Sequence, residues 1–476
     1  MTPPRGCRDE SHDSVPDCRF LIDLFDFLEE NRVLSSGEAA LRRDARLALA
    51  VSIQRQCAHW RQRGKRRAVC EGDENTRFFH ASATQQRRRN SISVLEVEGV
   101  RAVDHAGKAA ALLAFYFALL GRPREPVWHF DLAALYAQAP RVDGAKVVAQ
   151  FDLAEIKTAV DKLDRSSALG PDGLGPAFYQ AAWGWPPIFS GYSMNSMSAP
   201  LGWMGSTEPT GLTSRLQQQI ALLIDEDQSG FVRGRSISEN FVYAIELVQC
   251  CHRRAVLVVV LKLDFTKAFD SINWESLRTI MMVRGFPSRW CDWIDALYHS
   301  SRSVVLLNHA SGRWFQVKCG LRQGDPISPY LFLIVADVLQ QLIRQDDVLR
   351  HPLLPEEPAV VLQYADDTLI IMHVCADGVA RLRQILDQFA DATGLVINFS
   401  KSTLVPMHME GEVLERVVTA LGGATGTFPQ TYLGLPLSWD KLCFTDFLPM
   451  IAKVDKYLAG RAARLLLACR PPSSDQ

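Results

Sequence analysis

One short segment, residues 360–371, constrains the fold of this chain more than any other. Its sequence, VVLQYADDTLII, places two apolar, β-prone runs on either side of an Ala-Asp-Asp turn. That pattern predicts a β-hairpin with the carboxylates of Asp366 and Asp367 at its tip. Adjacent carboxylates repel each other and strands are depleted in aspartate, so a divalent cation such as Mg²⁺ is the simplest compensation. A solvated Asp-Asp turn without a ligand is the alternative interpretation.

A third carboxylate follows an apolar strand further upstream. Residues 255–264, AVLVVVLKLD, form a nearly continuous apolar run that ends in Asp264. Such a run predicts a buried central strand with Asp264 at its C-terminal end. Three carboxylates on two neighbouring strands would hold two metal ions about 3.5–4 Å apart, the arrangement that serves in-line phosphoryl or nucleotidyl transfer.

The sequence around these carboxylates resembles that of a known family. The stretches LDFTKAFDSINWESL and LQYADDTLII are similar to the palm of reverse transcriptases, in particular those of non-LTR (LINE-type) retrotransposons of plants. The resemblance implies an α+β right-hand polymerase with a mixed palm sheet packed on helices, truncated fingers and a partial thumb. It also implies that Asp264, Asp366 and Asp367 are the catalytic metal ligands. Two Mg²⁺ ions are the expected cofactor, with Mn²⁺ as a substitute.

Composition adds little about partners but excludes some classes of protein. The 476 residues carry 52 Lys and Arg against 53 Asp and Glu, so an argument for nucleic acid rests on local patches. The eleven cysteines show no metal-binding spacing and indicate reduced thiols in an intracellular protein. No secretory signal is evident, and the longest apolar run, residues 109–120, predicts a buried helix too short to span a bilayer. We therefore expect a soluble protein, with nucleus and cytoplasm both open.

The N-terminal part divides into two segments. Residues 1–19 are rich in Pro, Asp and Ser and predict disorder, and residues 20–150 predict a helical, basic segment ahead of the polymerase core. Residues 72–90 resemble the family's pre-polymerase stretch and imply contacts with template RNA. The candidate nucleic-acid-binding residues are Arg66, Arg67, Arg77, Arg87, Arg88 and Arg89. A solvated charged helix face and a core-packing segment are the alternatives.

The remaining boundaries follow from where the resemblance holds and where it breaks. Residues 151–183 resemble the start of the fingers, whereas residues 184–213 lack any periodicity and replace the family's fingers elements, including a lysine-bearing strand. An internal deletion is the expected cause. Residues 214–437 resemble the palm, and residues 438–476 resemble a partial thumb helix and tail.

The resemblance also implies substrate contacts inside the palm. Phe269 falls at the position of a sugar gate, with Phe265 beside it, and Lys401 falls near the triphosphate. A plain surface lysine is the alternative for Lys401, and a plain helix-entry loop is the alternative for the Arg-Gln-Gly segment. The other implied contacts are Arg233 and Arg235 with phosphates, Arg322, Gln323 and Gly324 with the nucleotide and template base, and Tyr432, Leu433 and Gly434 as the primer grip.

The function implied is RNA-directed DNA polymerisation, which adds a dNTP to a primer 3′-hydroxyl. Its partners would be an RNA template, a DNA primer and dNTPs, with no membrane and no obligate protein partner. A catalytically inactive retrotransposon remnant, or a maturase-like RNA-binding protein, is the alternative. Because interval 184–213 lacks the cations that hold a triphosphate in line, the isolated chain is expected to extend primers poorly.

Overall fold

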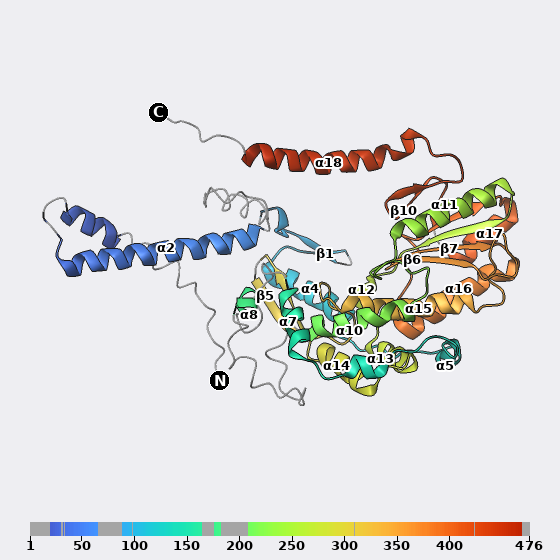
Figure 1. Ribbon diagram of the computed structural model, residues 1–476. Helices are drawn as coiled ribbons and strands as arrows, with labels where there is room; N and C mark the ends of the chain where they lie inside the picture. The colour runs from blue at the N-terminus through green and yellow to red at the C-terminus, as the bar shows by residue number, and fades with distance from the viewer. Residues whose placement is uncertain are drawn as a thin grey trace. The chain divides into compact units, whose positions relative to one another are not determined.

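The chain is described by a computed structural model (Figure 1). The structure describes residues 20–29, 32, 34–64, 88–97, 99–163, 176–181, 208–308, 310–422 and 424–468. Two compact units are present: one comprises Met1–Leu95 with Asp455–Gln476, and the other comprises Glu96–Val454. In the described residues, no helix combines the length and the apolar character that crossing a bilayer requires.

The elements of the chain alternate between helices and short strands, as an α+β protein does. The α+β class expected from the sequence is confirmed. The helices are α2 (Ser36–Gly64), α4 (His105–Leu120), α5 (Leu132–Leu135), α6 (Gly144–Val148), α7 (Leu153–Asp161), α8 (Pro176–Ala181), α10 (Glu208–Leu223), α11 (Ile237–Arg253), α12 (Ala268–Ser271), α13 (Trp274–Val283), α14 (Ser288–His299), α15 (Ser328–Arg344), α16 (Ala376–Thr393), α17 (Gly411–Leu421) and α18 (Phe444–Ala468). The strands are β1 (Leu95–Val97), β2 (Val100–Ala102), β3 (Val258–Leu263), β4 (Arg302–Leu307), β5 (Ala310–Gln316), β6 (Val360–Tyr364), β7 (Asp367–His373), β8 (Thr403–Met407), β9 (Ala424–Thr425), β10 (Gln430–Tyr432) and β11 (Leu435–Leu437).

In the first unit, a helix over residues 20–29 pairs with α2 through ionic contacts. Arg42 of α2 reaches both Asp26, at 3.0 Å, and Glu29. At the start of α2, the Ser35 hydroxyl accepts from the amide of Glu38, and the Glu38 carboxylate accepts from the amide of Ser35. This reciprocal capping fixes the first turn of α2.

The second unit is built on a five-stranded sheet with the strand order β6-β7-β3-β8-β9. Strands β6, β7, β3 and β8 are antiparallel to their neighbours, and β9 is parallel to β8, so the sheet is mixed as expected. The apolar strand β3 lies in the centre. Because both of its faces are covered, its residues are buried in succession and show no alternation.

The two faces of the sheet belong to different hydrophobic clusters. Val259, Leu261 and Leu263 of β3 point to a large cluster that includes α13, α15 and α16. The alternate residues Val258 and Val260 point to a smaller cluster, which α11 and the β10–β11 hairpin complete. Figure 1 shows α15 and α16 on one side of the sheet and α11 on the other.

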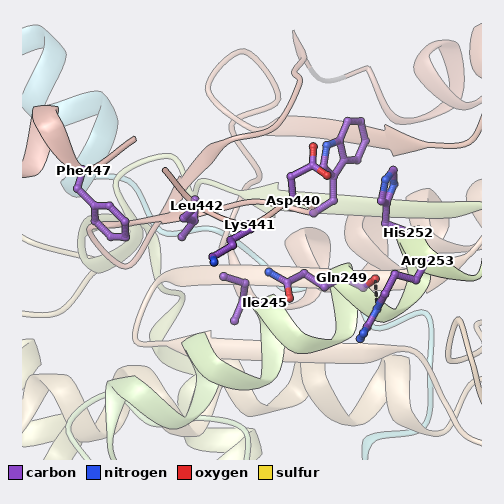
Figure 2. Close-up of a pocket in the computed structure, with 9 residues that line it drawn as sticks. Ile245, Gln249, His252, Arg253, Asp440, Lys441, Leu442 and Phe447 are labelled. Atoms are coloured by element: carbon purple, nitrogen blue, oxygen red, sulfur yellow. Dashed lines mark hydrogen bonds between the residues drawn. The ribbon is translucent and has the colours of Figure 1, made fainter. Parts of the chain in front are cut away.

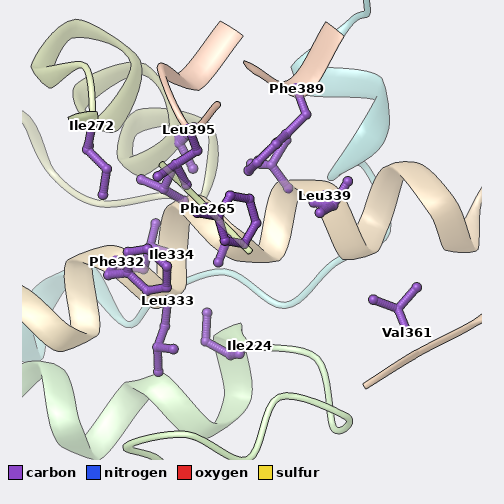
Figure 3. Close-up of a cluster of buried hydrophobic side chains, with 14 of the residues drawn as sticks. Ile224, Phe265, Ile272, Phe332, Leu333, Ile334, Leu339, Val361, Phe389 and Leu395 are labelled. Carbon is purple, nitrogen blue, oxygen red and sulfur yellow. The ribbon is translucent and has the colours of Figure 1, made fainter. Parts of the chain in front are cut away.

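Helix α15 forms the centre of the larger cluster. Its residues Phe332, Leu333 and Leu339 are fully buried, and Figure 3 shows them grouped with Phe265 and Phe389 from other elements. One charged residue interrupts this apolar helix. The carboxylate of Asp337 lies 3.2 Å from the Arg284 guanidinium, and both side chains are nearly inaccessible to solvent.

Three sequence predictions about elements need correction. Helix α4 covers residues 109–120, but it is not buried: Phe115 and Phe117 are 52% and 42% exposed. The sequence predicts a strand over residues 395–399, but these residues make a single bridge at Ile397, and the strand of this region, β8, begins only at Thr403. Residues 208–213, predicted as irregular, begin α10, because a proline is tolerated in the first turn of a helix.

Candidate active site

The three predicted carboxylates meet at one edge of the five-stranded sheet. In the β6–β7 hairpin, Tyr364 pairs with Asp367, so Ala365 and Asp366 form the two-residue turn. Strands β3 and β7 pair up to Leu263 and Thr368, which leaves Asp264 and Asp367 side by side one residue further along. Opposite residues of antiparallel strands have Cα separations of about 4.5–5.5 Å. The hairpin and the central strand therefore bring the carboxylates together.

The pKa of the Asp366 carboxyl is raised by its surroundings. The side chains of Asp366 and Asp367 are exposed at the surface, but the protein around the turn withdraws the Asp366 carboxyl in part from water. This partial burial is the largest cause that raises the pKa of Asp366, and the carboxylates of Asp367 and Asp264 raise it further. A hydrogen bond from its own backbone amide acts in the opposite direction.

This set of oxygen donors fits a hard divalent cation. Across the described ranges, none of the three carboxylates forms an ion pair with a Lys, Arg or His side chain. In those ranges no group of three or more His, Cys, Asp or Glu side chains, these three carboxylates included, is arranged to hold a metal ion by side chains alone. The carboxylates thus make an open, acidic edge. Mg²⁺ is commonly bound by one or two carboxylates, with water and substrate phosphates as the other ligands.

Residues 227–230 hold the turn that carries Asp366 by hydrogen bonds. The side-chain oxygen of Gln228 accepts hydrogen bonds from the amides of Gly230 and Ala365, both at 2.9 Å. The amide of Ser229 donates to the carbonyl of Gln363 at 2.9 Å. A Cβ atom on Gly230 would lie only 2.3 Å from the amide nitrogen of Ala365, so this close approach requires glycine.

The backbone of Asp264 is fixed by a second loop. The amide of Asp264 donates to the Ser402 hydroxyl at 3.1 Å, and its carbonyl accepts from the amide of Asn398 at 2.7 Å. Ser402 is fully buried. Sequence reasoning gave no role to Gln228, Asn398 or Ser402, because each acts through a partner that is distant in the chain.

The two aromatic residues predicted near the substrate have different environments. Phe269 is half-buried and stacks on Phe332 of α15, with ring centroids 5.1 Å apart and an interplanar angle of 14°. Phe265 is 7% exposed and packs edge-on against Phe389 in the larger cluster. Its side chain faces away from the side of β3 to which Asp264 belongs. Phe269 alone has an exposed part that a substrate can reach.

The two predicted phosphate-binding arginines also differ. Arg233 is exposed, and the described residues include no ion-pair partner for it. Arg235 donates to the carbonyls of Ala221 and Ile224 at 3.0 Å and to that of Gln228 at 2.8 Å, as well as to that of Asp225. These bonds occupy its guanidinium at the end of α10. Arg235 therefore has a structural role in this geometry, whereas Arg233 is available to a ligand.

The Arg-Gln-Gly loop before α15 presents only some of its residues. Arg322 is half-buried and donates to the Ser301 hydroxyl at 3.0 Å and to the Leu297 carbonyl at 2.6 Å, which ties it to the end of α14. Gln323 is exposed. Gly324 has a φ of +88°, and a Cβ there would meet no atom within 4 Å. Open space thus lies next to Gln323 and Gly324.

The predicted primer grip is a hairpin, formed by β10 and β11. Leu433 and Gly434 make its turn, with φ angles of +50° and +84°. Tyr432 is 1% exposed and belongs to the smaller cluster, so its side chain anchors the hairpin to the sheet. Lys401, predicted near the triphosphate, is exposed in the turn that precedes β8.

The basic residues of the N-terminal segment lie mostly outside the described residues, as Arg66, Arg67, Arg77 and Arg87 do. Arg88 and Arg89 are described, and both are exposed in a short helical stretch over residues 88–90. Their exposure is compatible with a role in binding phosphates.

A separate groove of about 530 Å³ lies between α11 and the segment that follows β11 (Figure 2). His252 and Arg253 of α11 line one side, and Asp440 and Lys441 line the other. None of the three site carboxylates borders this groove.

Residues 210–437 match the family model described as "Reverse transcriptase (RNA-dependent DNA polymerase)". A Xenopus laevis protein described as "Transposon TX1 uncharacterized 149 kDa protein" is 24% identical over 79% of this chain and 31% of its own length. The Pol polyprotein of a type-1 retrotransposable element R2 from Nasonia vitripennis is 25% identical over 52% of this chain and 24% of its own length.

The chain thus spans less than a third of the length of these two relatives. A solved structure of apo telomerase from Candida tropicalis is 10% identical, over 90% of this chain and 70% of that chain. Its TM-score of 0.39 is too low to establish a shared fold. The assignment of a family rests on the sequence comparisons.

Proposed function

Because this chain belongs to the reverse transcriptases of non-LTR retrotransposons, we propose that it catalyses RNA-directed DNA synthesis with Asp264, Asp366 and Asp367 as its metal-binding residues. The observation that carries the proposal is the meeting of these carboxylates at one open edge of the sheet. Carboxylates that form no ion pair with the described cationic side chains are suited to bind metal ions together with a negatively charged triphosphate.

Reverse transcriptases use divalent metal ions, and we propose Mg²⁺ here, with Mn²⁺ as a substitute. Bound at this edge, two such ions would make the primer 3′-hydroxyl more acidic and neutralise charge on the leaving pyrophosphate. Asp264 and Asp366 are proposed as the main ligands, with Asp367 assisting. Gln228 and Ser402 would keep the two carboxylate-bearing segments in place.

The proposed substrates are an RNA template, a DNA primer and dNTPs. Phe269 is proposed to exclude the 2′-hydroxyl of ribonucleotides, since its ring is held rigidly by the stack on Phe332. Arg233 and Lys401 are exposed cations for phosphates, and Gln323 and Gly324 border open space where a base pair could lie. The β10–β11 hairpin is proposed to contact the primer.

We expect the chain by itself to add nucleotides to a primer slowly. Interval 184–213 holds Glu208 as its one charged residue, so it supplies no Lys or Arg for the triphosphate. Its residues 184–207 lie outside the described residues. Positioning of reactants can contribute on the order of 7–11 kcal/mol to a bimolecular reaction, and weaker holding of the nucleotide would lose part of this.

The test is single-nucleotide addition to a DNA primer annealed to RNA, under single-turnover conditions with Mg²⁺. The chain should add the complementary dNTP slowly, and Asp366→Asn should reduce the rate by about 100-fold or more, since the metal ligand loses its charge. Asp347→Asn is the matched control, because the Asp347 side chain is fully exposed on another loop.

Luminescence of bound Tb³⁺ measures the site independently of turnover. Tb³⁺ should bind the chain and the Asp347→Asn variant equally, and should bind Asp366→Asn more weakly. Addition that persists in Asp366→Asn, or Tb³⁺ binding that this substitution leaves unchanged, would contradict the proposed role of the carboxylate edge.

A further inference from the structure

A single lysine interrupts the central apolar strand β3. Lys262 lies between Leu261 and Leu263, and all the other residues of the strand are buried and apolar. Since side chains alternate along a strand, Lys262 lies on the same face as Val258, Val260 and Asp264. That face is the one covered by α11 and the β10–β11 hairpin. Lys262 therefore lies between the covered part of this face and its acidic end.

The ammonium group of Lys262 has one specific partner in the structure. Its Nζ donates a hydrogen bond of 2.9 Å to the backbone carbonyl of Thr431 in β10. Within the described residues, Lys262 forms no ion pair with a carboxylate, although Asp264 is only two positions away. The charge of Lys262 is thus directed toward the hairpin.

The register of the hairpin explains why this carbonyl is available. Thr431 lies opposite Pro436, one residue beyond the pair Tyr432–Leu435 that closes the two-residue turn. Hydrogen-bonded and non-hydrogen-bonded pairs alternate in an antiparallel ladder, so the Thr431 carbonyl points away from β11. Lys262 supplies the donor for this outward-facing carbonyl. A hydrogen bond from a charged group is roughly twice as strong as one between neutral groups, so this contact is well suited to hold a strand of three residues.

The hairpin is held by apolar side chains as well as by Lys262. Tyr432 and Leu437 are both 1% exposed and fix the hairpin to the sheet. Lys262 fixes the carbonyl immediately before Tyr432, three residues before the turn at Gly434. The position of this turn relative to Asp264 therefore depends on a contact made from the strand that leads to Asp264.

We propose that Lys262 is a positioning residue, which sets the β10–β11 hairpin relative to Asp264 and thereby places the primer 3′ end beside the carboxylates. This inference rests on the proposed function, in which the hairpin contacts the primer. Residues two apart on a strand are separated by about 7 Å. A displacement of the hairpin at Lys262 therefore occurs within about one nucleotide length of Asp264.

The test compares Lys262→Met, which keeps the aliphatic stem but removes the donor, with Lys262→Arg, which keeps a charged donor. Lys146→Met is the matched control, because the Lys146 side chain is 69% exposed on α6. Binding of a DNA primer annealed to RNA, and of the same RNA without primer, is measured by fluorescence anisotropy with Ca²⁺ in place of Mg²⁺. Amide hydrogen exchange of residues 430–437 is followed in the same proteins.

Lys262→Met should weaken binding of the primed RNA by about ten-fold, the loss expected for a charged hydrogen bond, and should leave binding of unprimed RNA unchanged. Exchange should accelerate at residues 430–437 and stay unchanged at residues 258–263. Lys262→Arg should restore binding to within about three-fold, and Lys146→Met should have no effect.

Three results would overturn the inference. Equal losses on primed and unprimed RNA, with a smaller salt dependence, would show that Lys262 contacts phosphate directly. Faster exchange throughout β3 would indicate a general structural role. Unchanged exchange at residues 430–437, with primer preference intact, would remove the positioning role alone. A wild-type chain that binds primed and unprimed RNA equally would instead overturn the proposed function together with this role.

Discussion

Gln228 holds Ala365, a residue 137 positions later, in the turn that presents Asp366. The side-chain oxygen of Gln228 accepts from the Ala365 amide, and its side-chain nitrogen donates to the Ala365 carbonyl at 3.3 Å. Ala365 has a φ of +56°, a conformation that disfavours residues other than glycine. The backbone amide and carbonyl of Ala365 both form hydrogen bonds with the buried Gln228 side chain. Tertiary structure therefore holds this strained turn in place.

Gly230→Ala should destabilise the fold and distort this turn. The added methyl group would lie 2.3 Å from the Ala365 amide nitrogen, and overpacking of this kind lowers the free energy of unfolding by about 1–3 kcal/mol. Urea denaturation measures the loss, and Tb³⁺ binding measures the effect on the carboxylates. Gly37→Ala is the control, since a Cβ at Gly37 meets no atom within 4 Å. Equal stability of the two variants would contradict the close approach.

Phe269→Val should relax the selection of deoxynucleotides, provided that the proposed function holds. The ring of Phe269 stacks on Phe332, and a smaller side chain would leave space for a 2′-hydroxyl. We expect discrimination, measured as the ratio of kcat/KM for dNTP and rNTP, to fall about ten-fold or more. Tb³⁺ binding should stay unchanged. An unaltered ratio would remove the sugar-gate role.

Arg233→Gln should affect RNA binding, whereas Arg235→Gln should affect stability. Loss of the exposed Arg233 should reduce the salt dependence of RNA binding by about 0.7–0.9 in log–log slope, because one phosphate contact is lost. Loss of Arg235 should lower the free energy of unfolding, since four carbonyls near the end of α10 lose their donor. Salt titrations and urea denaturation on both variants separate the two roles. The reverse pattern would mean that the assignment is wrong.

Asp337→Asn should destabilise the second unit strongly. Asp337 lies 3.2 Å from Arg284 and also accepts from the Tyr136 hydroxyl at 3.0 Å and the Asp225 amide at 3.0 Å. Removing the carboxylate charge leaves the Arg284 charge buried without compensation, which typically lowers the free energy of unfolding by about 3–5 kcal/mol. Chemical denaturation measures this, with the exposed Asp347→Asn as reference. A change below about 1 kcal/mol would show that the pair adds little.

The sequence alone was sufficient for the elements whose signals are local. Two apolar, β-prone runs on either side of a turn predicted the β6–β7 hairpin, and a nearly continuous apolar run predicted the strand before Asp264; the structure confirms both. Helix α16 ends at Gly394, with a φ of +82°, as its glycine predicts. These features depend on residues adjacent in the chain, so a single sequence contains the information.

Where packing decides the environment of a residue, the sequence was less informative. The apolar composition of α4 predicted burial, but only its contacts in the folded chain decide that Phe115 and Phe117 remain exposed. Phe265 was predicted to contact substrate, yet the alternation of β3 directs its ring into the larger cluster. Arg235 is engaged by carbonyls that no sequence pattern indicates.

By itself, the sequence determined the chemistry at the site: which carboxylates occur, and that they end a central strand and tip a hairpin. Only the tertiary structure decided how those carboxylates are held. Gln228, Ser402 and Lys262 each make a side-chain contact with backbone groups that lie far away in the chain. Such hydrogen bonds form only after the strands have paired, because the acceptors and donors are brought together by the sheet. Periodicity cannot reveal them, since it records which face a residue occupies and not which partner it meets.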